Sequence, residues 1–320
     1  MKFTITIPCY KSQFLAEAID SVLNQSYQEF ELILVNDASP FPVDAVVGKY
    51  RDSRIKYIKN KVNCGAYNVV NNWNTCLQYA SGDYLIMMGD DDRLDKDCLT
   101  TYSLLIDQYQ DLNVYHGRTI IIDEKSQFVK LHEARPEWET LRSLMWHRLS
   151  GRMQYIGDFL FRRDWLIQNG GFVFFPLAWN SDDMTVFLAA KEKGIANTNT
   201  PVFNYRVNSS SISMSSYTQV KMECNKMYEG DVYHLLECTQ PYDDTDSLYE
   251  IMIKSALPNL FIKKTVHLLS LDFRNIGCWR TIKVFMSLKN KYHLPFWVII
   301  LSFIESLKLK KTNNGKNSVV

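Results

Sequence analysis

The sequence lacks the patterns that mark several common classes of protein. Its seven cysteines are scattered, with no CxxC and no paired spacing with histidine. This distribution disfavours a zinc site and a disulfide framework, and it indicates free thiols in a reducing compartment. A GxGxxG motif is also missing, which disfavours a dinucleotide-dependent oxidoreductase. The N-terminal MKFTITIPCYKSQF contains too short an apolar run for a signal peptide, so we expect a cytoplasmic protein.

Long apolar runs are scarce as well. The segment LPFWVIILSFIESLKLKK, residues 294–311, has an uninterrupted apolar core of about half the roughly 20 residues that cross a bilayer. Trp297 and the lysines that follow it suit a helix lying on an anionic membrane surface. A buried C-terminal helix with a solvated basic end explains the same pattern, so the sequence leaves both interpretations open.

Basic residues are concentrated in the C-terminal part of the chain. From Phe261 onward there are eleven Lys and Arg against two acids, and before it 25 against 33, although the whole chain is nearly neutral at +1. Such segregation indicates an anionic partner, either a membrane surface or a nucleic acid. Nucleic-acid binding would explain nothing in residues 1–210. We therefore expect no nucleic acid. Contact with the inner face of the cell membrane remains an alternative to a buried C-terminal helix.

The first hundred residues alternate between strand-like and helix-like segments. Strand patterns occupy residues 2–8, 30–36, 54–60 and 83–89. Helical spacing occupies residues 12–25 and 68–80, and Ser12 is available as a cap for the first of these helices. This order predicts an α/β fold with a mostly parallel central sheet and helices on both faces.

Beyond residue 112 the pattern is looser. We expect strands at 113–123, 159–163 and 201–207, a partly helical, Trp- and Arg-rich segment at 134–152, and a helix at 180–194. From about Thr218 the chain is helical in character. These patterns predict an α/β domain over residues 1–215 and a basic helical extension over residues 216–320.

Polar residues stand where the predicted strands end. Pro8 ends the first strand and Tyr10 follows it, Asp37 follows the second, and three consecutive aspartates, 90–92, follow the strand at 83–89. Ligands of such sheets gather beyond the carboxyl ends of the strands. Adjacent carboxylates can hold Mg²⁺ or Mn²⁺, which a diphosphate would share. A solvated acidic turn is the alternative for the aspartates taken alone.

Several segments together resemble family 2 glycosyltransferases with the GT-A fold, of the kind that build bacterial cell-surface polysaccharides. They are TIPCYKSQFLAEAIDSVLNQSYQEFELILVNDAS, NCG…NWN…ASGDYLIMMGDDDRLDKDCL and NGGF…NSDDMTVFLAAKEKG, and the resemblance covers roughly residues 3–210. It implies an inverting hexosyl- or N-acetylhexosaminyltransferase that uses Mn²⁺ or Mg²⁺. The donor would be a nucleotide-diphospho-sugar, most simply UDP-linked, and the acceptor a glycan or a lipid-linked saccharide.

The resemblance assigns roles on the donor side. Pro8 and Tyr10 would line the nucleobase pocket, Tyr10 by stacking, and Asp37 would accept a hydrogen bond from the base; a turn or cap role for Asp37 is the alternative. Asn63 and Asn74 match a family segment near the donor, where a purely structural role fits equally well.

The same resemblance assigns different roles to the three aspartates at residues 90–92. Gly89 stands at the first Asp of the family's DxDD pattern, so Asp90 would contact the ribose and Asp91 the metal and diphosphate, with Asp92 behind them. In YRVN, Asn208 replaces a family histidine near the diphosphate. Arg206 would then supply the positive charge to the donor, or the segment is only the edge of a lid.

Two acids follow a Gly-Gly-Phe segment at residues 170–172, as in the family. The resemblance makes Asp183 the general base and Asp182 a residue that orients the acceptor. Acids at a helix N-terminus also favour the macrodipole, which is the structural alternative. The histidines His116, His132 and His147 share no ligand spacing and suit core or surface positions.

Two other functions remain to be weighed. A sugar-nucleotide pyrophosphorylase would need a Gly-rich loop after the first strand, and PCYKSQFLAE contains no glycine. A non-catalytic sugar-nucleotide-binding protein is compatible with the departures at Gly89 and Asn208. The transferase requires that folding gather Asp37, the acidic triplet and Asp183 around one site.

Overall fold

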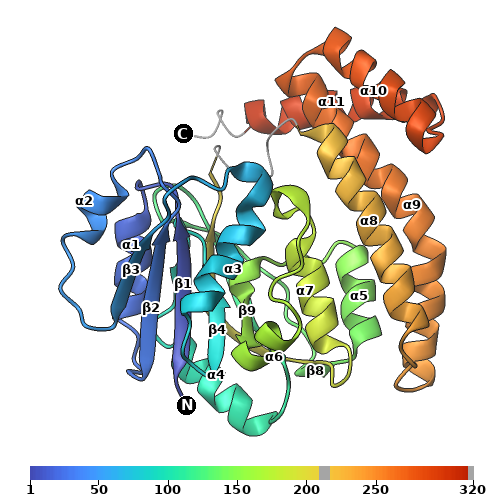
Figure 1. Ribbon diagram of the computed structural model, residues 1–320. Coiled ribbons are helices and arrows are strands. Elements are labelled where there is room, and N and C mark those ends of the chain that lie inside the picture. Colours follow the sequence, from blue (N-terminus) through green and yellow to red (C-terminus); the bar gives the residue numbers. More distant parts are fainter. Residues whose placement is uncertain (209–216, 316–320) are drawn as a thin grey trace. The chain divides into compact units, whose positions relative to one another are not determined.

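The computed structural model describes residues 1–208 and 217–315 (Figure 1). Contacts divide the chain into two compact units, Met1–Ser209 with Thr239–Glu250, and Ser210–Cys238 with Ile251–Val320. All the predicted site residues belong to the first unit. The predicted boundary between residues 215 and 216 lies outside the described residues, so that boundary stays a prediction.

A single twisted sheet is the frame of the first unit. Its strands are β1 (Phe3–Cys9), β2 (Phe30–Asn36), β3 (Ile55–Lys59), β4 (Tyr84–Met87), β5 (Arg93–Leu94), β6 (Val114–Ile122), β7 (Phe128–Leu131), β8 (Trp138–Glu139), β9 (Phe159–Arg162) and β10 (Ile195–Arg206). They follow the order β3-β2-β1-β4-β9-β6-β10-β5, with β7 paired to β6 and β8 to β10. The longer ladders, β1 with β2, β2 with β3 and β6 with β10, are parallel, and β9 runs antiparallel between β4 and β6.

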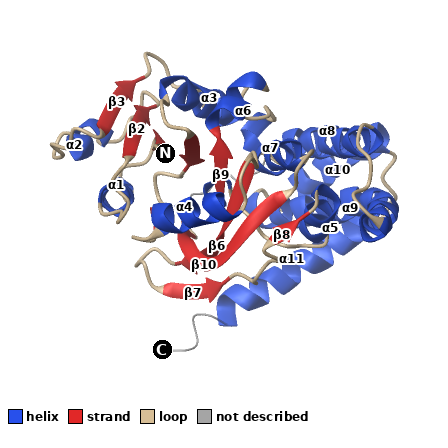
Figure 2. Ribbon diagram, turned by 90° about the horizontal axis from the view of Figure 1, so that it is seen from below, coloured by secondary structure: helices blue, strands red, loops and turns tan. Residues whose placement is uncertain are grey.

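Helices cover both faces of this sheet, as the sequence predicts. They are α1 (Leu15–Leu23), α2 (Val43–Val47), α3 (Val69–Tyr79), α4 (Cys98–Gln108), α5 (Leu141–Leu149), α6 (Arg163–Gln168) and α7 (Ser181–Ala190), with short 3₁₀ turns η1 (Ala66–Asn68), η2 (Ile156–Asp158) and η3 (Pro176–Ala178). Figure 2 shows α1 and α4 on the opposite face of the strands from α3. Alternation along β1 explains this arrangement, because Phe3, Ile5 and Ile7 all point into the core cluster shared with α1 and α4.

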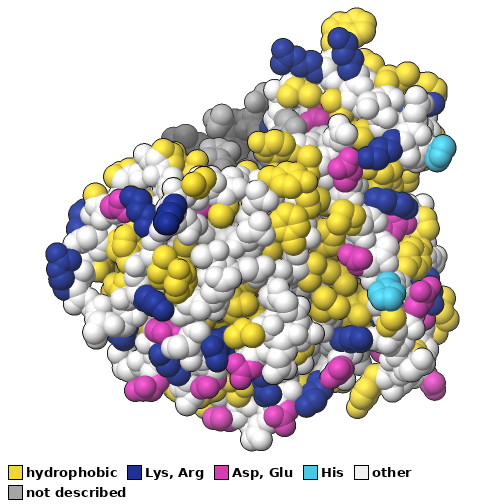
Figure 3. All heavy atoms as spheres, in the orientation of Figure 1, with side chains coloured by type: hydrophobic (Ala, Val, Ile, Leu, Met, Phe, Trp, Pro, Cys, Tyr) yellow, Lys and Arg dark blue, Asp and Glu magenta, His cyan; other side chains and the backbone are white. Residues whose placement is uncertain are grey.

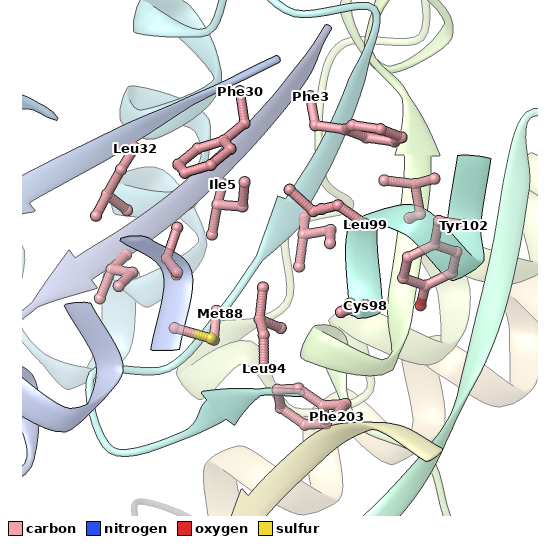
Figure 4. Close-up of a cluster of buried hydrophobic side chains, with 14 of the residues drawn as sticks. Phe3, Ile5, Phe30, Leu32, Met88, Leu94, Cys98, Leu99, Tyr102 and Phe203 are labelled. Carbon is pink, nitrogen blue, oxygen red and sulfur yellow. The ribbon is translucent and has the colours of Figure 1, made fainter. Parts of the chain in front are cut away.

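The core fixes both ends of the acidic turn that follows β4. Met88 and Leu94 are 0% and 3% exposed and belong to one buried cluster with Phe203 of β10 (Figure 4). The N–H of Met88 donates to the carbonyl of Thr6 at 2.9 Å, which extends the β4 pairing to the turn itself. Residues 89–93 are therefore held between two anchored apolar side chains, and their carboxylates occupy defined positions.

The start of α1 differs from the sequence-based prediction. The helix begins at Leu15 with Phe14 in the cap position, and no side chain caps it, so Ser12 does not take the predicted role. The backbone N–H groups of Tyr10 and Lys11 donate instead to Asp90, which anchors the loop before the helix. The helices α2 and α4 and the short strands β5, β7 and β8 were not anticipated from the sequence.

The second unit consists of helices, as predicted from about Thr218 onward. It contains α8 (Thr218–Glu237), the part of α9 (Asp244–Asn275) from Ile251 onward, α10 (Cys278–Tyr292) and α11 (Trp297–Gly315). None of the helices in the described part of the chain combines the length and apolar character that crossing a bilayer requires.

Helix α11 buries one narrow face and exposes another. Val298 and Ser302 are fully buried, whereas Trp297, Ile300 and Ile304 are 49%, 59% and 43% exposed. The helix is thus neither fully packed nor fully solvated. On the side of the molecule drawn in Figure 3, hydrophobic side chains lie beside Lys and Arg over the C-terminal helices.

Candidate active site

Asp37 follows β2 directly and is held from several sides. Its N–H donates to the carbonyl of Cys9 at 3.0 Å, which ties it to the end of β1. Its carboxylate accepts from Asn60 Nδ2 at 2.9 Å, from Asn63 Nδ2 at 3.1 Å and from the N–H of Cys64. The Asn63 side chain therefore orients Asp37, where the sequence suggested a contact with the donor. The carboxylate is nearly buried, at 7% exposed, and has a fixed direction.

Tyr10 lies at the end of β1, beside Asp37 and Asp90. The carboxylate oxygen Oδ2 of Asp90 accepts from the backbone N–H groups of Tyr10 and Lys11 at 2.7 and 2.6 Å. The Tyr10 ring is 42% exposed and meets Phe41 edge to face at 5.7 Å between centroids. An exposed aromatic ring on an anchored backbone is suited to stacking on a planar ligand. Pro8, in β1, stands two residues before it.

The ionised form of the Asp90 carboxyl is destabilised by its surroundings. Burial, and then the neighbouring Asp91 carboxylate, raise the pKa of Asp90 to about 7. The same two causes raise the pKa of Asp92 well above its usual value. A bound cation beside the triplet would favour the ionised forms of both acids.

Asp92 and Arg206 lie behind the turn. Asp92 Oδ1 accepts from the backbone N–H of Arg206 at 2.9 Å. The Arg206 guanidinium donates to the carbonyl of Asp91 at 2.7 Å and to Glu17 Oε2 at 3.0 Å, and it stacks over Phe14. Its side chain is fully buried. This burial does not fit the prediction that Arg206 faces the donor. The guanidinium instead holds the backbone of the turn through its hydrogen bond to the carbonyl of Asp91.

Gly89 gives the turn the room that it needs. A Cβ at this position would lie 2.7 Å from Asp92 Oδ2 and 3.0 Å from Asp91 Oδ1. The family pattern has an aspartate where this chain has Gly89, and here the carboxylates of Asp91 and Asp92 lie close to the backbone of residue 89. An aspartate at residue 89 would require Asp91 and Asp92 to move.

Asp91 differs from the other two acids of the triplet because its carboxylate is accessible. Its side chain is 20% exposed, and its Oδ2 contacts the Asn208 amide and lies 4.0 Å from Lys11 Nζ. Among the described residues no group of three His, Cys, Asp or Glu side chains could hold a metal ion. Mg²⁺ and Mn²⁺ commonly bind through one or two carboxylates together with substrate phosphates and water. A single accessible carboxylate fits that mode of binding.

The acids at the start of α7 have different surroundings. Asp183 Oδ1 accepts from Arg148 Nε at 2.7 Å and from Gln154 Nε2 at 2.9 Å. Asp182 lies in the first turn of α7, where the backbone N–H groups of residues 182 and 183 partly offset the rise in its pKa. Burial, and then the charge of Asp183, raise the pKa of Asp182 to about 7. Asp182 thus stands where a carboxylate favours the helix macrodipole, whereas Asp183 points to an arginine and an amide outside its own helix.

A buried acid that the sequence analysis missed connects the two groups of carboxylates. Asp158 of η2 is fully buried, its pKa is raised to about 7 chiefly by that burial, and the charge of Asp182 raises it further. The charge of Asp158 in turn contributes to the raised pKa of Asp92. Contacts link the same groups, because Gln154 donates to Asp183 and the next residue, Tyr155, donates its N–H to Asp158 and stacks on Tyr205. The residue after Tyr205, Arg206, donates its N–H to Asp92.

Aromatic rings lie beside this connection. Tyr155 stacks on Tyr205, with 3.7 Å between ring centroids and 10° between the planes, and the charges of Asp158 and Asp92 raise the pKa of Tyr155 after burial itself.

The predicted site residue Asn74 contacts the Gly-Gly-Phe segment, where its side-chain oxygen accepts from the N–H of Phe172. Neither Tyr155 nor Asp158 stands in a sequence pattern that would have identified it. Arg148 lies within the Trp- and Arg-rich segment at residues 134–152, for which the sequence predicted partial helicity and no role for a single residue.

Comparison with known proteins places the chain in a family. A sequence model described as glycosyl transferase family 2 matches residues 4–170, slightly more than half of the chain. The chain belongs to glycosyl transferase family 2. The resemblance seen in the sequence is thereby confirmed, and the matched region contains the acidic triplet and Asp37.

Curated relatives within the family match shorter stretches. The poly(ribitol-phosphate) beta-N-acetylglucosaminyltransferase TarS of Staphylococcus aureus is 28% identical over 113 residues, 34% of this chain and 19% of TarS. The UDP-Glc:alpha-D-GlcNAc-diphosphoundecaprenol beta-1,3-glucosyltransferase WfgD of Escherichia coli is 34% identical over 90 residues, 28% of this chain and 34% of WfgD. The matched stretches thus span between about a fifth and a third of these relatives.

Solved structures extend the likeness to most of the chain. The structure of TarS residues 1–349 in complex with UDP has a TM-score of 0.61 at 16% identity and covers 85% of this chain and 80% of that one. The mannosyltransferase PcManGT of Pyrobaculum calidifontis, in complex with GDP-Man and Mn²⁺, has a TM-score of 0.54 at 15% identity and covers 96% and 87%. At these identities the likeness concerns the fold alone, and the predicted GT-A fold is confirmed.

Proposed function

We propose that this family 2 protein transfers a sugar, with inversion, from a nucleotide-diphospho-sugar to a glycan or lipid-linked acceptor. The observation that supports the proposal is the short chain of contacts from Asp183 through Gln154, Tyr155 and Tyr205 to the turn that contains Asp92. Donor-side and acceptor-side carboxylates must stand this close if they are to act on one sugar. TarS in its complex with UDP-GlcNAc and WfgD with UDP-Glc support a UDP-linked donor.

In the proposed reaction Asp183 is the general base. The acceptor oxygen forms a bond to the anomeric carbon while the bond from that carbon to the diphosphate oxygen breaks, and the nucleoside diphosphate leaves with the electron pair. The acceptor proton passes to Asp183. Both hydrogen bonds found for Asp183 among the described residues go to Oδ1. Arg148 and Gln154 therefore fix the carboxylate and leave Oδ2 to accept the proton.

On the donor side, Asp37 and Tyr10 would bind the base and Asp90 the ribose. Asp91, with Asn208 beside it, would hold the divalent cation. A bound Mn²⁺ or Mg²⁺ would neutralise charge on the leaving diphosphate, and the Mn²⁺ in the PcManGT complex supports this choice. Lys11 lies within reach of the same phosphates, 4.0 Å from Asp91.

The structure also bears on the alternatives. In a pyrophosphorylase, backbone N–H groups after β1 would have to bind a triphosphate, but here those of Tyr10 and Lys11 already donate to Asp90. A non-catalytic sugar-nucleotide-binding protein would need no base, and the Asp183–Arg148 pair would then have no catalytic task.

The full-length protein should release nucleoside diphosphate from one UDP-sugar in a panel of UDP- and GDP-linked donors. Release should require Mn²⁺ or Mg²⁺, be lost in EDTA and accelerate with a suitable acceptor. The same panel should identify the donor by a rise in melting temperature, because a ligand that binds only the folded state stabilises it. Stabilisation by a donor without any turnover would favour the sugar-nucleotide-binding protein and contradict the transferase.

The acceptor is proposed to lie at the inner face of the membrane. TarS and WfgD act, by their names, on a polyol phosphate and on a diphosphoundecaprenol-linked sugar. The second unit supports membrane contact because α11 exposes Trp297, Ile300 and Ile304, and lysines follow them in sequence. Apolar side chains that enter the interface beside basic residues are typical of surface-bound helices.

Vesicle co-sedimentation tests this contact. The protein should sediment with vesicles that contain phosphatidylglycerol more than with neutral phosphatidylcholine vesicles, and added salt should weaken binding because each surface lysine contributes about 1 kcal/mol. Ile300→Glu with Ile304→Glu should release the protein. Leu104→Glu, at a 66% exposed leucine of α4, is the matched control and should change nothing. Equal loss in both variants, or no sedimentation of the parent, would refute the contact.

A further inference from the structure

A basic cavity of about 320 Å³ lies in the first unit, outside the residues assigned to the donor and the base. Its walls come from β6, β7 and the segments that flank α5. The lining residues are His116, Arg118, Lys130, Leu131, His132, Glu133, Arg135, Gly151, Arg152 and Met153. The volume is at the lower end of the roughly 300–1,000 Å³ of small-molecule sites.

The floor of this cavity is built from buried cationic and imidazole side chains. Arg135, Arg152 and His116 are 5%, 8% and 3% exposed. Each has a nitrogen with no hydrogen-bond partner among the described residues: Arg135 Nη1, Arg152 Nε and His116 Nδ1. Buried polar atoms are nearly always paired. Three unpaired nitrogens on residues that line one cavity are therefore unusual and indicate a ligand that supplies acceptor oxygens.

Charges around the floor do not balance. Arg152 Nη2 pairs with Glu139 at 3.0 Å, but Arg135 makes its guanidinium hydrogen bond to a carbonyl, that of Met153. Burial, and then the positive charge of Arg152, lower the pKa of Arg135 to about 9. Arg118 and Lys130 add positive charge at the wall, where Glu133 is the lining carboxylate. The buried carboxylates of Glu139 and Asp158, which are not in the lining, partly offset the lowering of the Arg135 pKa. An anion bound here would relieve the repulsion between the buried arginines.

The cavity adjoins the proposed base through Arg148. While Arg148 Nε donates to Asp183, its Nη1 donates to the carbonyl of Arg152 at 3.1 Å. His132 stacks on Tyr155, with 5.7 Å between centroids, next to Asp158. The cavity therefore lies on the acceptor side of the site, and its exposed rim is formed by Lys130, Glu133, Gly151 and Met153.

We propose that this cavity binds a phosphoryl group carried by the acceptor, so that the acceptor is anionic and is held by Arg135, Arg152 and Lys130. The proposal rests on the proposed transferase function. Arginine forks match phosphate oxygens in bidentate geometry. A phosphoryl group offers more acceptor oxygens than a carboxylate does, which suits a floor with several unpaired donors.

The first experiment measures anion binding by the full-length protein. Inorganic phosphate should raise the melting temperature saturably at constant ionic strength with UDP present in excess, whereas acetate should not. Lys130→Gln and Arg135→Gln should each weaken the phosphate effect about tenfold or more. Lys56→Gln, at another exposed strand lysine, should leave it unchanged. Because Lys130 is exposed, its variant stays informative even if Arg135→Gln fails to fold. No phosphate effect in the parent, or an equal effect in Lys130→Gln, would overturn the proposal.

The second experiment separates an acceptor phosphate from free phosphate. With the donor found above, a sugar 1-phosphate and the methyl glycoside of the same sugar serve as acceptor probes. Lys130→Gln should raise KM about tenfold for the sugar phosphate only. Phosphate binding with equal KM effects on both probes would mean a free-phosphate site and overturn the acceptor assignment. Absence of turnover with every donor would refute the transferase, whereas the cavity is tested by phosphate binding alone.

Discussion

Asp183→Asn should lower sugar transfer by about 10²–10⁴-fold, the usual contribution of a general base, and leave donor affinity unchanged. The amide retains the shape of the side chain and can still contact Arg148 and Gln154 through its oxygen, so the fold should be kept. What is lost is the oxygen that takes the acceptor proton. Transfer rates and donor Kd, measured on the same preparations, give the comparison.

Asp182→Asn is the matched control, because the neighbouring acid lies in the same helical turn. The pKa of Asp182 is raised to about 7 in the folded protein, so ionising this carboxyl lowers the free energy of unfolding. The destabilisation is absent below about pH 4 and grows as the pH rises to 7. The variant should therefore melt higher than the parent at pH 8 and alike at pH 4, with a smaller loss of transfer than Asp183→Asn. If Asp182→Asn abolished transfer and Asp183→Asn did not, the base would be Asp182.

Much of the fold follows from short-range patterns. The buried strands β2 and β4 contain continuous apolar runs, and β1 alternates apolar residues with threonine. The strand-helix alternation predicts parallel pairing between them. Helix α4 was missed because CLTTYSLLIDQ mixes threonines and serine into its apolar spacing. Ser12 failed as a cap for a different reason, since a carboxylate 78 residues away, Asp90, holds the backbone before it. Local propensity contains no information about such a partner.

The candidate site, like the fold, was predicted where short-range patterns determine it and missed where distant residues do. Asp37, Tyr10 and the triplet were predicted because strand ends in a parallel sheet meet at one edge, and the structure brings them together there. The burial of Arg206 was not predictable, because it depends on Glu17 and Phe14 from the distant α1 region. The basic cavity also escaped the sequence analysis. Arg135 and Arg152 are unremarkable arginines until folding buries both beside one void.

Asp91→Ala should remove metal-supported turnover, by about a hundredfold or more, without unfolding the protein. A metal ion at a leaving group contributes several kcal/mol, and each 1.4 kcal/mol is a factor of ten in rate. The side chain is partly exposed, and its contacts are with Asn208 and Lys11 at the surface of the turn. Release of nucleoside diphosphate across a Mn²⁺ series, together with melting temperatures, measures both effects. Asp107→Ala, at an exposed acid of α4, is the control.

The stability change of Asp91→Ala has a predicted sign. After burial itself, the Asp91 charge raises the pKa values of Asp90 and Asp92, so its removal lowers both and makes their ionisation less costly at neutral pH. The variant should therefore melt at or above the parent temperature at pH 8 while losing activity. A turn held by Met88 and Leu94 does not need the carboxylate to keep its shape. Full Mn²⁺-dependent turnover in the variant would show that the cation binds elsewhere. Activity of the parent in EDTA would instead assign the positive charge at the diphosphate to Lys11, whose ammonium already lies beside Asp91.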